Sequence, residues 1–119
     1  MNQRKVGNEQ EELAAAYLLQ QGFHIVERNF RVRQGEIDII GYDQEVLVFV
    51  EVKYRKSSCS GLPEEAVDYR KQRQICKVAL FYLNAKKLGV DRACRYDVVA
   101  VFGDEIRWYK NAFEHCVEY

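Results

Sequence analysis

The spacing of apolar side chains changes several times along the 119-residue chain, and each change predicts a different element. In residues 8–20 the apolar positions recur at helical intervals, which predicts a first helix that stops at Gly22. Its apolar stripe consists of Leu13, Ala14, Tyr17 and Leu18. We expect Asn8 to cap this helix, with Glu11 three residues later as in a capping box.

Three strands are predicted after this helix. Residues 23–32 alternate between apolar and polar with a period of two, and we expect a bulge or bend at Arg28 and Asn29. Residues 35–40 and 46–53 form two further strands, and the intervening residues 41–44 predict the turn of a hairpin.

The second half of the chain predicts one helix and two strands. Residues 57–61 are small and polar, which indicates a flexible loop, and Pro63 suits the first turn of a long helix that continues to Lys87. Residues 96–102 and 106–109 are predicted strands joined by a short turn. The order α β β β α β β predicts an α/β fold, with a mixed five-stranded sheet flanked by two helices.

Composition indicates one folded domain that spans residues 1–119. Apolar residues make up 48% of the chain and charged residues 30%, with a single proline, which is typical of a globular protein. No apolar run approaches the roughly twenty residues that span a bilayer, and the four cysteines lack the spacing of a zinc site. We therefore expect a cytoplasmic protein with reduced thiols and no membrane partner. The net charge of +0 does not by itself indicate a nucleic-acid partner.

Charged side chains interrupt the two middle strands, where apolar residues would be expected. Glu51 and Lys53 share one strand face with two apolar residues, and Glu36 and Asp38 share a face of the preceding strand. If the two strands form a hairpin, Asp38, Glu51 and Lys53 come within reach of one another. Charge that is partly buried in this way is costly and often functional, although an ordinary ion-paired strand face remains the alternative.

This residue set matches the needs of metal-dependent phosphodiester cleavage. Mg²⁺ prefers oxygen ligands and keeps several waters, so Asp38 and Glu51 with the peptide carbonyl of Val52 are a sufficient candidate ligand set, in which Mn²⁺ can substitute. Lys53 can hold the attacking water or meet negative charge as it develops. Glu11 or Glu36 can add a further carboxylate.

Two runs of sequence carry a resemblance to a known family. Residues 35–38 (GEID) and 49–55 (FVEVKYR) resemble the YraN-like family of small bacterial proteins. That family looks like a branch of the PD-(D/E)XK nucleases related to archaeal Holliday junction resolvases. The resemblance covers nearly the whole chain, including Glu11 and Ala14 on the first helix and the run 95–99 (RYDVV).

The resemblance implies a restriction-endonuclease-like core and a metal-dependent site. By residue type and position, the acids of the nuclease motif correspond to Asp38 and Glu51, and its lysine corresponds to Lys53. The helical acid of the resolvase relatives corresponds to Glu11, and the family places a lysine at Lys71. Branched DNA would be the implied substrate, and symmetrical cleavage of a four-way junction would require a homodimer.

Basic residues flank the acidic strands and recur in the long helix. They are Arg28, Arg31, Arg33, Arg55, Lys56, Arg70, Lys71, Arg73 and Lys77. Of these we predict Arg31, Arg33, Arg55 and Lys71 as contacts to DNA phosphates, while a solvated face balanced by nearby acids is the alternative. Aromatic residues at strand and helix periods are more often core than base-stacking platforms, so we assign most of them to the core.

The sequence therefore predicts a magnesium-dependent DNA endonuclease and leaves two rivals. One rival is a nucleic-acid-binding module that keeps the fold without the chemistry, marked by salt-sensitive binding and no cleavage. The other is a protein-interaction scaffold, marked by an exposed apolar patch around Trp108 and Tyr109.

Overall fold

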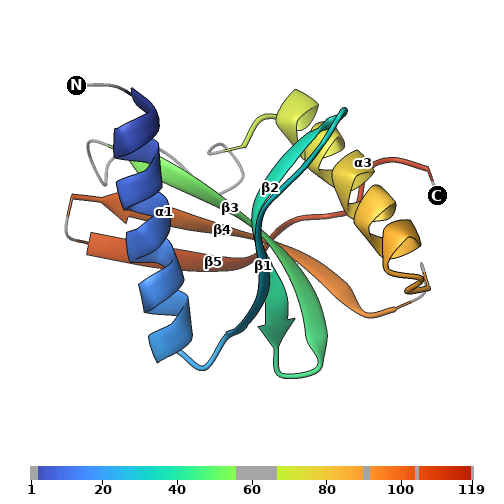
Figure 1. Cartoon of the computed structure of the whole chain (residues 1–119), viewed down its shortest axis with the longest axis horizontal. Coiled ribbons are helices and arrows are strands. Elements are labelled where there is room, and N and C mark those ends of the chain that lie inside the picture. Colours follow the sequence, from blue (N-terminus) through green and yellow to red (C-terminus); the bar gives the residue numbers. More distant parts are fainter. Residues whose placement is uncertain (1–2, 56–66, 90–91, 104, 119) are drawn as a thin grey trace.

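A computed structural model describes residues 3–55, 67–89, 92–103 and 105–118, with residues 3–8 described by their backbone alone. The elements are labelled in Figure 1 and occur in the order α β β β α β β, which confirms the prediction. They are α1 (Gln3–Gln20), β1 (His24–Val32), β2 (Gly35–Asp43), β3 (Val46–Arg55), α3 (Tyr69–Ala85), β4 (Cys94–Phe102) and β5 (Glu105–Phe113). No helix in these ranges has the length and apolar content needed to cross a bilayer.

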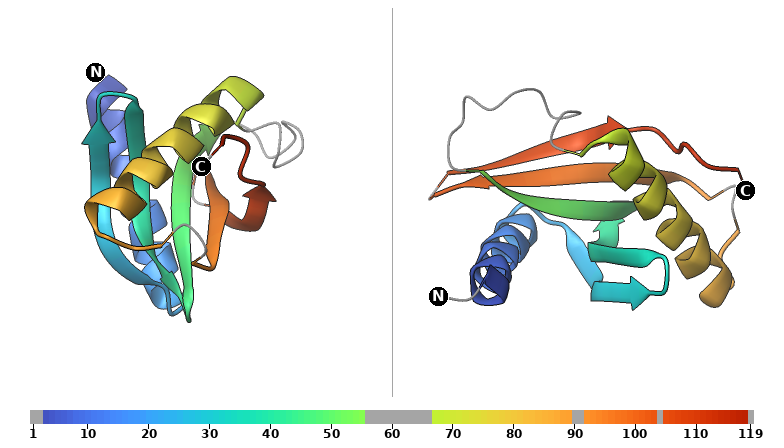
Figure 2. Two further views of the ribbon diagram at one scale, coloured as in Figure 1. Left: turned by 90° about the vertical axis from the view of Figure 1, so that its right-hand side faces the viewer. Right: turned by 90° about the horizontal axis from the view of Figure 1, so that it is seen from above.

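The five strands form one mixed sheet in the order β1-β2-β3-β4-β5. The pairs β1–β2, β2–β3 and β4–β5 are antiparallel, whereas β3 and β4 are parallel. A parallel pair needs a long crossover connection, and α3 is part of it. The sheet is strongly twisted, so that α1 and α3 lie apart on either side of the central strands (Figures 1 and 2).

Strand β3 is packed on both faces, so its alternating side chains enter two separate cores. Val48 and Val50 are fully buried in the cluster that includes α1, while Leu47 and Phe49 are buried in the cluster that includes α3. Each such burial contributes about 1.5–3 kcal/mol relative to exposure. Glu51 follows Phe49 on the α3 side, and the second core fixes its position.

Both helices begin at different residues from those predicted. Helix α1 starts at Gln3, so Asn8 lies inside it and cannot be its cap. Helix α3 starts at Tyr69, because the Asp68 carboxylate caps it by accepting a hydrogen bond from the Lys71 backbone amide at 2.8 Å. The predicted start at Pro63 and the predicted loop at 57–61 lie outside the described residues.

Strand β5 is longer than predicted and carries a bulge opposite Asp97. Asn111 adopts φ 55° there, and the β4–β5 register shifts between Tyr96 and Val98. The Asp97 carboxylate is fully buried and accepts hydrogen bonds from Arg95, Trp108 and the Asn111 backbone amide at 2.8–2.9 Å. Fully partnered in this way, Asp97 stabilises the bulge.

Trp108 and Tyr109 on this hairpin do not form the exposed apolar patch that was named as the mark of an interaction scaffold. Trp108 packs edge-on against Phe23 at 6.0 Å between ring centroids and is joined to Asp97, and neither Trp108 nor Tyr109 is classed as exposed. The mark that would have favoured an interaction scaffold is missing from these described residues.

Strands β1 and β2 bend together next to Asp38. Asn29 adopts φ 54°, at the predicted irregularity, and the register shift of this pair lies nearby, between Ile25 and Glu27. On β2, Ile37 belongs to the α3-side core and Ile39 to the α1-side core, although a regular strand would point both side chains the same way. The bend therefore turns the strand at Asp38, where β2 and β3 begin to separate.

Candidate functional site

Three carboxyl groups from three elements meet where β2 and β3 separate. Asp38 lies on β2, Glu51 on β3 and Glu11 on α1. Glu11 and Glu51 each lie close enough to share a side-chain hydrogen bond with Asp38. Asp38 also contacts the backbone of β3, where its Oδ2 accepts a hydrogen bond from the Val52 amide at 2.8 Å. The hairpin predicted from the sequence thus brings the acidic residues together.

Burial and like charge make the ionised form of Glu51 costly. Only 7% of the residue is exposed. Burial, followed by the charge and hydrogen bond of Asp38, raises the pKa of Glu51 to about 8, against the opposing effect of Lys71 and Lys53. A carboxyl group with this pKa is largely protonated at neutral pH unless a further cation, such as a metal ion, binds beside it.

Glu11 belongs to the same electrostatic cluster. Burial, then the neighbouring Asp38 and Glu36, raises the pKa of Glu11 to about 7, and Arg28 acts in the opposite direction. Glu36 lies nearer the surface, where its Oε2 accepts hydrogen bonds from Arg31 Nε at 3.1 Å and Nη2 at 2.9 Å. The structure thus brings all four predicted acids into one region, with Glu36 shared between this region and Arg31.

Two lysines face Glu51 from different elements. The Nζ of Lys53 lies 4.0 Å from Glu51 Oε2, and the Nζ of Lys71 lies nearer, at 3.7 Å. The sequence predicted Lys71 as a DNA contact, whereas the structure places it against a carboxylate. This contact was missed because it depends on how α3 docks against β3, which no local sequence pattern encodes.

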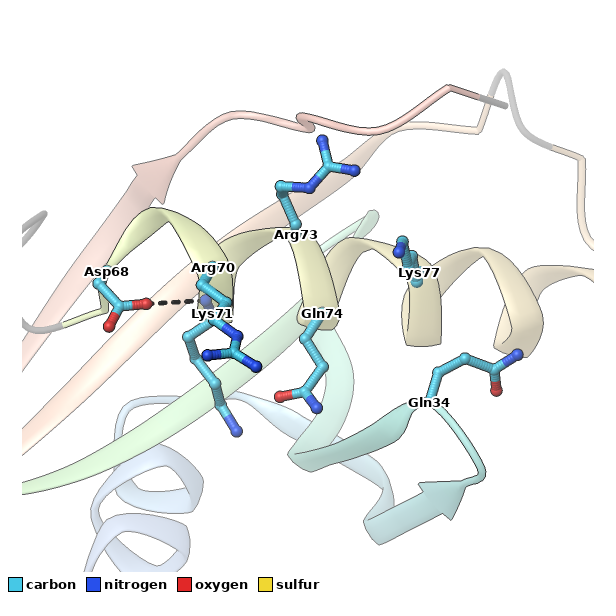
Figure 3. A pocket seen from close by; sticks show the side chains of 7 residues that line it. All are labelled: Gln34, Asp68, Arg70, Lys71, Arg73, Gln74 and Lys77. Atoms are coloured by element: carbon cyan, nitrogen blue, oxygen red, sulfur yellow. Dashed lines mark hydrogen bonds between the residues drawn. The ribbon is translucent and has the colours of Figure 1, made fainter.

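A groove of about 480 Å³ runs along α3 next to this cluster (Figure 3). Its lining residues are Gln34, Asp68, Arg70, Lys71, Arg73, Gln74 and Lys77. Four of them are cationic, and the carboxylate of Asp68 already caps the helix. Lys71 lines the groove and also pairs with Glu51, so the groove and the carboxyl cluster are continuous.

The other basic residues predicted as phosphate contacts lie elsewhere. Arg31 is engaged with Glu36, Arg33 is exposed, and Arg55 is half-buried at the end of β3. None of the three is among the described residues that line the groove. Of the four predicted phosphate contacts only Lys71 lines the groove, together with the other basic residues of α3, Arg70, Arg73 and Lys77.

The donor set suits a hard divalent cation that keeps part of its hydration shell. Among the described residues, no group of three or more His, Cys, Asp or Glu side chains is placed to hold a metal ion by itself. Mg²⁺ needs fewer protein ligands than that, because one or two carboxylates with waters and substrate phosphate complete its octahedron. Asp38 and Glu51 are neighbouring oxygen donors of this kind, and Val52 adjoins them.

Comparison with known proteins places this site in a family context. A model described as "Uncharacterised protein family UPF0102" matches residues 10–101 of the chain. The chain is 47% identical over 114 residues to a UPF0102 protein of Lachnoclostridium phytofermentans, covering 96% of this chain and 97% of the relative. It is 49% identical to one from Syntrophus aciditrophicus, covering 92% and 89%, and 44% identical to one from Coxiella burnetii, covering 98% and 96%.

Proposed function

The chain belongs to the uncharacterised protein family UPF0102, the YraN-like family, and from the geometry of its site we propose that it hydrolyses DNA phosphodiester bonds with the aid of Mg²⁺. One observation carries this proposal: three carboxyl groups and two lysines converge at one end of a cationic groove. Few purely structural arrangements place three mutually repelling acids together, because like charges raise the free energy of the folded state.

In the proposed mechanism Asp38 and Glu51 hold the divalent cation, with the carbonyl oxygen of Val52 as a further donor. A cation bound there supplies charge neutralisation at the phosphate and activation of water. The Val52 amide fixes the orientation of Asp38 through a hydrogen bond of 2.8 Å to its Oδ2.

Lys53, Glu11 and Glu36 are assigned the remaining roles at the reacting phosphate. Lys53 is one side-chain period from Glu51 on the same strand face, so it is the residue we assign to the attacking water and to developing negative charge. Glu11 adjoins Asp38 and is the candidate proton acceptor or additional carboxylate. Glu36 is the alternative to Glu11 in this role, but it already pairs with Arg31.

Within DNA, we assign branched molecules as the substrate, and a homodimer would let two such sites cut opposite strands.

A second candidate is a nucleic-acid-binding module without chemistry. It is favoured by the groove itself, whose cations lie on α3 and would bind phosphate regardless of the carboxyl groups. The two candidates differ in whether any cut product forms.

The test is cleavage of synthetic four-way junctions, flaps and linear duplexes by the purified chain with Mg²⁺ or Mn²⁺. We expect wild type to cut, and Asp38→Asn to lose at least about 100-fold in rate because an amide is a poor metal ligand. Glu45→Gln is the matched control: it removes an exposed carboxylate from the β2–β3 turn and should leave the rate unchanged. Equal cleavage by Asp38→Asn and wild type would rule out the assigned site.

A further inference from the structure

An exposed aromatic ring stands at the start of α3, next to the groove. Tyr69 is 60% exposed, and the guanidinium of Arg73 lies 5.8 Å from its ring centroid. Other tyrosines, such as Tyr82 and Tyr96, are buried in the α3-side core. Other large side chains, such as Tyr54 and Phe81, are also exposed, but Tyr69 lies beside the cationic groove, where a base can stack on its ring.

The groove beside Tyr69 offers cations but few competing anions. Arg70, Lys71, Arg73 and Lys77 line it, and α3 contains no acidic residue from Tyr69 to Ala85. Successive positive charges along one helix suit the phosphates of a single extended strand. A duplex would require cations over a wider surface, and the net charge of +0 leaves few for that purpose.

Two amide side chains complete the groove. Gln74 projects from α3 toward the β1–β2 turn, and Gln34 lies at that turn (Figure 3). Gly35 makes this approach feasible, because a Cβ there would come within 2.8 Å of the Gln74 side chain. An amide both donates and accepts hydrogen bonds, which suits the Watson–Crick edges of bases, and these edges are open only in an unpaired strand.

We infer that the groove binds single-stranded DNA, with bases stacked on Tyr69 and phosphates held by Arg70, Arg73 and Lys77. Lys71 joins this groove to Glu51, so the strand leads directly into the carboxyl cluster. The inference rests on the proposed function for the choice of DNA, and it narrows that function to substrates with an unpaired segment, such as flaps and splayed junction arms.

Binding can be measured apart from cleavage, in EDTA, by fluorescence anisotropy of a labelled 15-nucleotide strand and of the blunt duplex of the same sequence. We expect the single strand to bind at least about tenfold more tightly than the duplex. Tyr69→Ala should weaken single-strand binding by roughly 5- to 100-fold, as expected for loss of one stacked base. Tyr69→Phe keeps the ring and should stay within about twofold of wild type.

Charge variants supply the matched control. Arg73→Gln should weaken binding and reduce its salt dependence, whereas Lys87→Gln removes an exposed charge beyond the end of α3 and should change neither. Circular dichroism would verify that each variant is folded. Equal binding of strand and duplex, or equal binding by Tyr69→Ala and wild type, would overturn the inference.

Failure of this inference and failure of the nuclease proposal give different results. Tyr69-dependent binding of single strands with no cut under Mg²⁺ or Mn²⁺ supports the strand assignment and removes the nuclease. Cleavage of blunt duplex that is unchanged in Tyr69→Ala leaves the nuclease standing and removes the strand assignment.

Discussion

At the scale of single residues, the carboxyl group of Glu51 shows a conflict between burial and charge. It is nearly enclosed, adjoins Asp38, and has only two lysines at 3.7 and 4.0 Å to offset its ionisation. A protein under selection for stability alone would place an apolar residue there. A loss of stability at a cluster of buried charged side chains is characteristic of catalytic and binding sites.

This conflict predicts how stability depends on pH without metal. The pKa of Glu51 rises from 4.5 unfolded to about 8 folded, so between these values the native state binds more protons. The free energy of unfolding should therefore fall as pH rises from about 5 to 8, by about 3–4 kcal/mol from this residue. Urea unfolding in EDTA across this range would measure it.

Glu51→Gln provides the comparison for that measurement. The amide has no proton to lose, so the variant should be more stable than wild type at pH 8 and close to it at pH 5. Because the other titratable groups, Glu11 among them, are present in both proteins, the difference between the two curves isolates Glu51. If the free energy of unfolding changed with pH in the same way in both proteins, the raised pKa of Glu51 would be wrong.

The sequence alone predicted much of this cluster, but it did not predict the contacts that depend on the position of α3. Asp38, Glu51 and Lys53 could be placed together because a two-residue side-chain period and one hairpin determine their faces. The nearness of Lys71 to Glu51 depends on how α3 docks on the sheet, which no local pattern encodes. The exposure of Tyr69, the first residue of α3, likewise depends on how the helix docks.

At the scale of elements, the β1–β2 pair depends on Gly41. A Cβ at this position would overlap the backbone carbonyl oxygen of His24 and come within 2.5 Å of the Phe23 ring. Because backbone cannot move aside as a flexible side chain can, Gly41→Ala should lower the free energy of unfolding by about 2–4 kcal/mol. Thermal unfolding followed by circular dichroism would show this loss.

Gly103→Ala is the matched control for that variant. Gly103 has φ 60° but nothing within 4 Å of its added Cβ, so it should lose only about 1 kcal/mol from backbone strain. If the two glycine variants are equally stable, close backbone packing at Gly41 does not stabilise the β1–β2 pair.

The order of elements could be predicted more accurately than their ends. Period-two and helical patterns identified every strand and both described helices, since burial on a sheet or helix face imposes those periods. The end of β5 was missed because Lys110 and Asn111 interrupt its alternation at a bulge. The buried carboxylate that accepts a hydrogen bond from this bulge belongs to Asp97, which lies 14 positions away on another strand.

At the scale of the whole molecule, metal binding should stabilise the fold. A cation that binds only the folded protein raises its stability by mass action, by about 2.7 kcal/mol at a hundredfold excess over Kd. We expect Mg²⁺ to raise the melting temperature of wild type by several degrees, and Asp38→Asn to lose most of this shift. Differential scanning calorimetry with and without EDTA would record both.

Lys53→Met separates binding from chemistry in the same experiment. It should keep the Mg²⁺-dependent shift in melting temperature while losing cleavage, because Lys53 is assigned to water and charge rather than to ligation. An equal shift in Asp38→Asn and wild type would place the cation elsewhere on the molecule.

The parallel pairing of β3 with β4 has a consequence for the order of folding. The meander β1–β2–β3 consists of local hairpins, whereas β4 can join only after the chain has crossed over through α3. Asp38 and Glu51 therefore meet early, and the ammonium group of Lys71 arrives with the later, slower contacts. On the ribosome, Glu51 would therefore have Lys53 beside it but not Lys71 until β4 had emerged and α3 could dock, so the cationic groove would join the carboxyl cluster only when synthesis was nearly complete.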